Sequence, residues 1–175
     1  FDDSLSRHVQ EIIDTMGAKE LKVRGHKLLE NLFESYIPNS CKEVKLEKRL
    51  SATLDGKYPI NGILDKIEFD DDVIRIVDYK TGSTENAANE LEKGNDYWRQ
   101  AAYYNILIQE SSDFDTKGKS VETRYVFVDD ENVDARYSMH DIKLSEQEIE
   151  EVKTQIRNTL ESIRAANFSD GCGRE

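Results

Sequence analysis

The sequence has few cysteines and no long hydrophobic run. Only two of its 175 residues are cysteines, Cys41 and Cys172, so it offers no disulfide framework and fits a reducing compartment. No stretch approaches the roughly 20 consecutive apolar residues that a membrane-spanning helix needs. The first residues also lack the basic region and apolar run of a signal peptide. We therefore expect a cytoplasmic protein that does not enter a membrane.

Positive charge is scarce as well. Lys and Arg number 24 against 36 Asp and Glu, which gives a net charge of −12. A protein that binds nucleic acid by itself is usually basic, because neutralising phosphates supplies most of the affinity. Composition alone therefore favours an acidic protein with no nucleic-acid role. The alternative is a catalytic module to which a partner delivers the nucleic acid, with a carboxylate-rich metal site adding to the negative count.

The length suits one domain with its own hydrophobic core. We predict a single domain over residues 1–175, with a helical part over 1–40 and a catalytic α/β core over 41–175. The chain begins with Phe1 instead of Met, and we expect it to be a piece of a longer protein.

Hydrophobic periodicity predicts a mixed sheet flanked by helices. Apolar residues at helical spacing, including Leu29 and Phe33, predict helix from about Ser4 to Tyr36 with a break at Gly17. The pattern then changes to alternation, and Asp55-Gly56 predicts a hairpin turn. The predicted elements after it are strands at Tyr58–Phe69 and Val73–Lys80 joined by an acidic turn, a helix from Ala87 or Tyr97 to Gln109, strands near Val121–Val128 and Asn132–His140, and a final helix after a Ser145–Glu148 capping box.

The functional signal lies in the second and third predicted strands. Asp78 and Lys80 are two residues apart on a strand and so project from one face. That strand is otherwise apolar, where ionisable groups are costly unless they are paired or bound to metal. With Asp65 from the preceding strand, two carboxylates could hold Mg²⁺, which takes oxygen ligands from the protein and from substrate phosphates. A buried Asp–Lys ion pair at the end of a sheet would explain the same residues, so residue types alone leave both interpretations open.

The order Gly62-x-x-Asp65, a short turn, then Asp78-Tyr79-Lys80-Thr-Gly resembles the core of RecB-like nucleases in the PD-(D/E)XK superfamily. The resemblance implies an α/β fold with a restriction-endonuclease-like mixed β-sheet flanked by helices. It also implies metal-binding roles for Asp65, Asp78 and the main-chain carbonyl of Tyr79, with Mg²⁺ or Mn²⁺ as the ion. Asp65, Asp78 and Lys80 would form the catalytic set, in which Lys80 positions the attacking water or stabilises charge.

Two flanking motifs extend the resemblance. Gln100 and Tyr104 match the family's Gln-x-x-x-Tyr motif and share one helix face, where the resemblance implies DNA contact. An amphipathic helix edge would also explain this pair. Gly25-His26 matches a helical Gly-His motif, which implies His26 as a metal ligand, although a lone histidine beside an apolar face is often structural. Glu47 lies where relatives often carry a glutamate, but a solvated strand face explains it equally well, and we assign it no role.

The function that the resemblance implies is metal-dependent cleavage of DNA, with an exonuclease expected. Such domains are often joined to helicases, so a helicase domain or subunit is the expected partner, with DNA repair or recombination as the context. An inactive nuclease-fold module that binds DNA or a partner is the alternative, and an acidic interaction domain is a second. Some relatives bind an iron–sulfur cluster through four cysteines. Two cysteines cannot complete such a site, and we expect no cluster in this chain.

The turn between the second and third strands yields a geometric prediction. If Asp71 and Asp72 form a two-residue loop, Asp70 pairs with Val73, and the same register places Asp65 directly opposite Asp78. Opposed residues of one sheet face have Cβ atoms about 4.5–5.5 Å apart, close enough to share an ion. A longer loop would shift the pairing by one or two residues.

Overall fold

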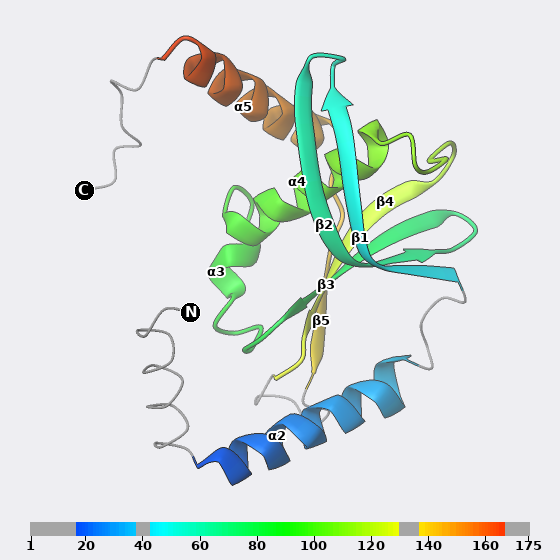
Figure 1. Cartoon of the computed structure of the whole chain (residues 1–175), viewed down its shortest axis with the longest axis vertical. Coiled ribbons are helices and arrows are strands. Elements are labelled where there is room, and N and C mark those ends of the chain that lie inside the picture. Colours follow the sequence, from blue (N-terminus) through cyan, green and yellow to red (C-terminus); the bar gives the residue numbers. More distant parts are fainter. Residues whose placement is uncertain (1–16, 38–42, 130–136, 167–175) are drawn as a thin grey trace.

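A five-stranded mixed sheet forms the centre of the computed structural model, which describes residues 17–37, 43–129 and 137–166 (Figure 1). The strands lie in chain order, and every neighbouring pair is antiparallel except β3 and β4, which are parallel. Their bounds are β1 Glu43–Leu54, β2 Tyr58–Phe69, β3 Val73–Lys80, β4 Ser120–Phe127 and β5 Ser138–Ile142. A parallel pair needs a long crossover, and α3 and α4 provide it. The predicted mixed sheet flanked by helices is confirmed.

The helices lie close to their predicted positions, with one correction. Their bounds are α2 Ala18–Asn31, the π-helical turn η1 Leu32–Tyr36, α3 Ala88–Leu91, α4 Asp96–Glu110 and α5 Glu146–Arg164. Of the two starts predicted for the helix that ends near Gln109, Tyr97 is close to the start of α4, and Ala87 is wrong, because Glu92 is extended and Gly94 adopts a φ of 90° between α3 and α4. The helix predicted from Ser4 and the strand predicted from Asn132 begin outside the described residues.

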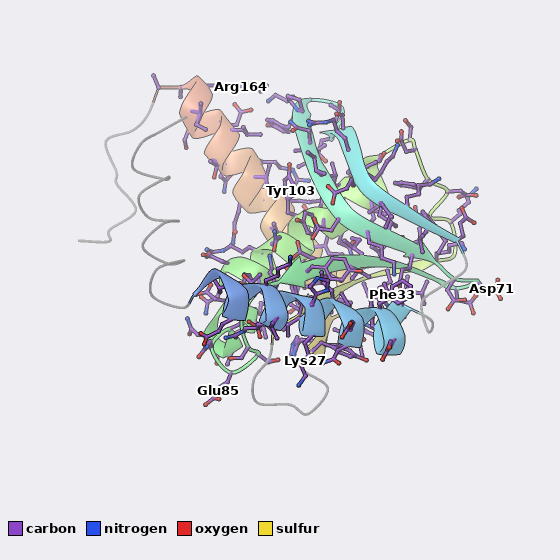
Figure 2. All side chains as sticks on the ribbon, turned by 60° about the horizontal axis from the view of Figure 1, so that its bottom comes forward. Lys27, Phe33, Asp71, Glu85, Tyr103 and Arg164 are labelled. Atoms are coloured by element: carbon purple, nitrogen blue, oxygen red, sulfur yellow. The ribbon has the colours of Figure 1, made fainter. Side chains whose placement is uncertain are left out.

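The predicted turns have the expected chemistry. Asp55 and Gly56, with φ of 53° and 66°, turn the chain between β1 and β2 in a left-handed conformation that favours hairpins. In Figure 2, Asp71 lies at the outer tip of the β2–β3 turn. The capping box before α5 is present, since the Ser145 hydroxyl accepts from the Glu148 amide while the Glu148 carboxylate accepts from the Ser145 amide.

Helices cover both faces of the sheet. Ile74 and Ile76 of β3 face the main core with α4 and α5, while Val77, the residue after Ile76, faces the smaller cluster at the end of α2. That cluster contains Tyr36, Val77 and Val126, with Leu32, Tyr79, Val128 and Tyr137 packed against it. Figure 1 shows α2 at the end of the molecule away from α5. Strand alternation therefore separates two apolar layers.

Two apolar residues of the first helical segment, Leu29 of α2 and Phe33 of η1, are exposed. Leu29 and Phe33 are 67% and 70% exposed, although they fall at helical spacing with the other apolar residues. The helix packs through another side, where Leu28 and Leu32 are partly buried and Tyr36 is buried. A single helix lying on a sheet buries one stripe, so apolar residues a quarter turn away stay in solvent. None of the helices in the described part of the chain is long and apolar enough to cross a membrane.

Candidate active site

The register between β2 and β3 is the predicted one. The Asp70 amide donates to the Val73 carbonyl at 2.9 Å, and the paired residues run from Phe69–Ile74 to Lys66–Val77. Asp65 and Asp78 are the next pair in this register. The acidic turn therefore has the two-residue loop that the sequence predicted.

The backbone pairing stops one step before the two aspartates. If the ladder continued, the Tyr79 amide would donate to the carbonyl of Leu64. It donates instead to Oδ2 of Asp65 at 3.1 Å. The side chain thus takes the place of a main-chain acceptor where β2 leaves β3, and this bond fixes the Asp65 carboxylate against the backbone beside Asp78.

Asp78 is the most deeply buried member of the predicted catalytic set, with 5% of the residue exposed. Its Oδ1 accepts a hydrogen bond from the Tyr104 hydroxyl at 3.1 Å, and its Oδ2 lies 2.8 Å from Nζ of Lys80. Burial raises the pKa of Asp78 above its ordinary value, Lys80 and Tyr104 pull that pKa down, and the charge of Asp65 raises it further. A carboxylate whose ionised form is disfavoured in this way would be stabilised by a nearby cation.

Four side chains form a closed ring of polar contacts at this point. Nζ of Lys80 donates to Oε1 of Gln100 at 2.9 Å, and Nε2 of Gln100 donates to the Tyr104 hydroxyl at 3.0 Å. The bond from Tyr104 to Asp78 and the Asp78–Lys80 pair complete the ring. The sequence placed Gln100 and Tyr104 on one helix face and predicted that they contact DNA. In the structure both residues lie beside Asp78 and Lys80. The Gln100 amide bonds to Lys80 and Tyr104, and the Tyr104 hydroxyl bonds to Asp78.

Two tyrosine rings enclose the Lys80 amine. Its Nζ lies 4.5 Å from the ring centroid of Tyr97 and 5.3 Å from that of Tyr125. The Tyr125 hydroxyl donates to the Tyr97 carbonyl at 2.6 Å and lies 3.3 Å from Oε1 of Gln100. Cation–π attraction therefore adds to the polar ring in holding the ammonium group. Tyr125 could not be predicted as a site residue from the sequence, because its position beside Asp78 depends on the parallel pairing of β3 with β4.

Asp65 also lines a cleft near the point where the β2–β3 pairing stops. This cleft of about 600 Å³ is lined by Ile37, Val44, Leu46, Glu47, Asp65, Lys66 and Tyr79. Glu47 occupies the position opposite Asp65 in the β1–β2 register, and this pair is missing from an otherwise continuous ladder. Its φ of 47° is left-handed, a conformation uncommon for a residue with a side chain. The strand irregularity therefore places Glu47 in the same cleft as Asp65.

His26 is not among the residues that line the cleft of Asp65 or that contact Asp78. It is exposed on α2 and lines a hollow of about 420 Å³ together with residues of α2 and η1, among them Leu29 and Phe33. Within the described ranges, no group of three or more His, Cys, Asp or Glu side chains is placed to hold a metal ion. The candidate metal donors beside the ring are thus two carboxylates, Asp78 in the ring and Asp65 next to it. That pair suits Mg²⁺, which binds through one or two carboxylates and takes further oxygens from water and substrate phosphate.

Comparisons with known proteins place these features in a family. A search of the curated proteins gave no significant match. Among solved structures, the chain is similar to a "Putative exonuclease" from Eubacterium rectale, with a TM-score of 0.50, 12% identity, and coverage of 85% of this chain and 55% of that one. It thus spans about half the length of that protein, and the likeness shows the fold alone.

A second solved structure, SSO0001, gives a TM-score of 0.41 at 17% identity, over 94% of this chain and 69% of that one. The family comparison covers more of the chain than either structure does. The PD-(D/E)XK nuclease superfamily matches residues 2–173, and the chain belongs to this superfamily.

Proposed function

We propose that this protein is a metal-dependent DNA nuclease that acts as an exonuclease. The observation that carries the proposal is the closed ring at the end of β3, where a buried carboxylate, Asp78, is paired with Lys80 beside the fixed carboxylate of Asp65. Membership of a nuclease superfamily supports a hydrolase that acts on nucleic acid. Clustered ionisable groups with a shifted pKa are typical of catalytic sites.

The proposed division of labour follows from the chemistry of each group. Asp65, Asp78 and the Tyr79 carbonyl would hold Mg²⁺ or Mn²⁺, which polarises a phosphate and makes bound water more acidic. Lys80 offers an ammonium group that can hold the attacking water and stabilise negative charge developing on the phosphate. Gln100 and the two tyrosine rings keep that amine at one position. His26 enters the proposal as a ligand on the resemblance alone.

The acidic charge bears on how DNA reaches the site. A chain with a net charge of −12 repels a polyanion over most of its surface, so affinity for DNA must come from local contacts or from a second protein. We propose that a helicase domain or subunit delivers the strand and supplies most of the phosphate contacts. The proposed setting is DNA repair or recombination in the bacterial cytoplasm.

A nuclease assay on linear DNA tests the proposal. The purified chain should degrade the DNA when Mg²⁺ or Mn²⁺ is added and should stop when the ion is chelated. Lys80→Ala should lower the rate by about a hundredfold or more, because removing one group that stabilises the transition state has an effect of this order. The matched control is Lys48→Ala, which removes another Lys–Asp pair, the 2.7 Å contact between half-buried Lys48 of β1 and Asp113 in the loop after α4.

The outcomes separate the proposal from its alternative. Full activity of Lys80→Ala would refute the assigned mechanism. A wild-type chain that stays inactive with either ion, yet binds DNA, would identify an inactive nuclease-fold module in which Asp78 and Lys80 form a structural ion pair. Calorimetric titration with Mn²⁺ completes the test, since Asp78→Asn should weaken ion binding and Lys80→Ala should not.

A further inference from the structure

A second hollow adjoins the ring on the side of α4 and α5. This groove has a volume of about 560 Å³, within the range of small-ligand sites. Gln100 and Tyr104 line it and also belong to the ring, so these two side chains form the boundary between the groove and the Asp78–Lys80 pair. The other lining residues are Pro59, Ile60, Arg99, Tyr103, Val152, Gln155, Ile156, Thr159 and Leu160.

The lining suits a flat ring with polar edges. Ile60, Val152 and Ile156 supply aliphatic walls, and Tyr103, labelled in Figure 2, supplies an aromatic one. The exposed Gln155 and Thr159 of α5 offer hydrogen-bonding groups at the edge. Nucleobases bind proteins through this combination of stacking on side chains and hydrogen bonds at their edges.

Arg99 adds an uncommitted positive charge. It is exposed, and it has no ion-pair partner in the part of the chain that the structure describes. By contrast, Arg75, Arg124 and Arg157 each contact a carboxylate at 2.7 Å or less. In a chain with 36 acidic residues, a free arginine beside an apolar groove is placed to meet an anion from outside the protein.

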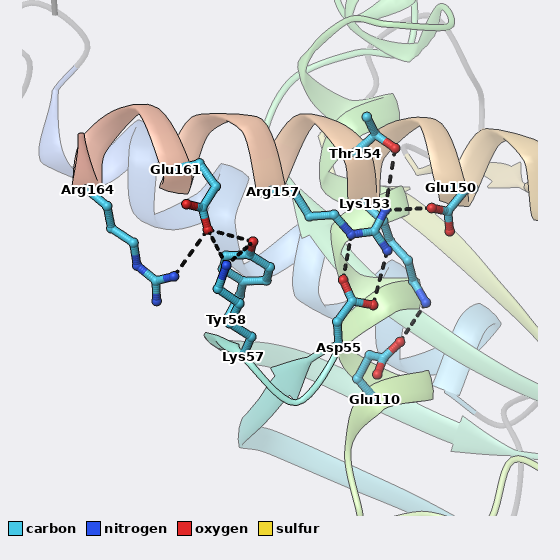
Figure 3. Close-up of polar contacts among 10 residues, drawn as sticks. All are labelled: Asp55, Lys57, Tyr58, Glu110, Glu150, Lys153, Thr154, Arg157, Glu161 and Arg164. Carbon is cyan, nitrogen blue, oxygen red and sulfur yellow. Dashed lines mark hydrogen bonds and ion pairs between the residues drawn. The ribbon is translucent and has the colours of Figure 1, made fainter. Parts of the chain in front are cut away.

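The walls of the groove are held in place by contacts that need no ligand. Figure 3 shows α5 tied to the β1–β2 hairpin, where Arg157 donates twice to Asp55, at 2.5 and 3.1 Å. Lys57 and Tyr58 both donate to Glu161 of α5 at 2.7 Å. A groove formed in advance binds its ligand with little cost for ordering the protein.

We propose that this groove binds the base of an unpaired nucleotide next to the scissile phosphate, with Arg99 on a neighbouring phosphate of the same strand. This assignment rests on the proposed function, because it names the part of the substrate that lies beside the ring. A base inside a duplex would have to leave its stack to enter the groove. The site therefore favours single-stranded DNA or frayed ends over intact duplex.

Equilibrium binding without cleavage tests the groove directly. The probes are two fluorescent single-stranded oligonucleotides of equal length, one of thymidines and one of abasic nucleotides, measured by anisotropy with a chelator present. The wild-type chain should bind the thymidine strand about tenfold tighter, since stacking of a single base gives an effect of this order. Thr159→Trp places a large side chain in the groove from an exposed helix position and should abolish the difference.

Arg99 is tested by the salt dependence of the same binding. Arg99→Ala should weaken binding of both strands and lower the slope of log affinity against log salt by about 0.7, the value for one lost phosphate contact on a single strand. Arg49→Ala is the matched control, because Arg49 is also exposed, lies outside the groove lining and has no ion pair with any described residue. It should leave both the affinity and the slope unchanged.

Each outcome decides one question. Equal binding of the two strands by the wild-type chain overturns the groove assignment, even if the protein cleaves DNA. A preference for thymidine that Thr159→Trp leaves intact, with the variant folded by circular dichroism, overturns it as well. Base-dependent binding by a chain that cleaves nothing with Mg²⁺ or Mn²⁺ supports the groove and refutes the proposed nuclease function.

Discussion

Tyr104→Phe removes one oxygen atom from the polar ring and keeps the aromatic ring. The lost hydroxyl donates to Oδ1 of Asp78 and accepts from Nε2 of Gln100. The substitution therefore asks whether the motif on α4 positions the catalytic pair or contacts DNA. A positioning role predicts a change in kcat, and a DNA contact predicts a change in KM.

The expected size follows from the bonds that remain. A hydrogen bond to a charged group contributes about 1.5–3 kcal/mol. After the substitution, Asp78 still has Lys80 on its other oxygen at 2.8 Å, so we expect the lower end of that range. About 1.5 kcal/mol in the activation free energy corresponds to roughly a tenfold lower kcat. KM should change much less, because the hydroxyl that is removed is engaged by Asp78 and Gln100 and the aromatic ring that lines the groove is kept.

Steady-state kinetics on linear DNA with Mn²⁺ provide the measurement. Tyr103→Phe is the matched control for kcat, because it keeps the aromatic side chain that lines the groove and removes only a hydroxyl that contacts the backbone of Asn61 on β2, away from the Asp78–Lys80 pair. This control should keep the wild-type kcat. A Tyr104→Phe protein with unchanged kcat and a raised KM would refute the positioning role and restore the interpretation of a DNA contact.

The remaining predictions concern stability and the metal. Folding raises the pKa of Asp78, so ionising this group costs stability as the pH rises from the ordinary aspartate range through the raised pKa. Asp78→Asn should therefore match or exceed wild-type stability at neutral pH in chelator, and a clear loss in chemical denaturation would contradict this. His26→Ala should reduce Mn²⁺-dependent cleavage less than Asp78→Asn does, because His26 is exposed on α2, and equal loss of activity in both variants would argue against that placement. Arg157→Ala should lower the melting temperature by a few degrees at most, since both Arg157 and Asp55 are at the surface, and a large drop would show that the tie to α5 matters more than expected.

The sequence predicted β2, β3 and the register between them because the signals were local. Asp55-Gly56 and the acidic run before Val73 are typical of turns, and these two turns set the start and end of β2 and the start of β3. Once a two-residue loop is assumed, every later pair of residues along the antiparallel strands is fixed. Asp65 opposite Asp78 could therefore be derived from residue numbers.

What the sequence did not predict depends on contacts between distant segments. Tyr125 meets Lys80 because β4 lies parallel to β3, and a parallel pair has no turn from which its register could be read. The exposure of Leu29 and Phe33 depends on which side of α2 faces the sheet, and helical spacing alone does not decide this. The missing pair between Glu47 and Asp65 goes with the left-handed backbone of Glu47 inside β1. Neither the composition nor the alternation of β1 predicts this conformation.

The break in the ladder and the ring act together on the site. A regular β2–β3 pair would direct the Tyr79 amide to a main-chain carbonyl, and the Asp65 side chain would then be free to rotate. Because Asp65 accepts that amide, one carboxylate is fixed by the backbone of β3. The other, on Asp78, is fixed by Tyr104 and Lys80. Because each carboxylate is held by its own contacts, the repulsion between them is not relieved by rotation of either side chain, and a bound cation would relieve it, as the proposed metal site requires.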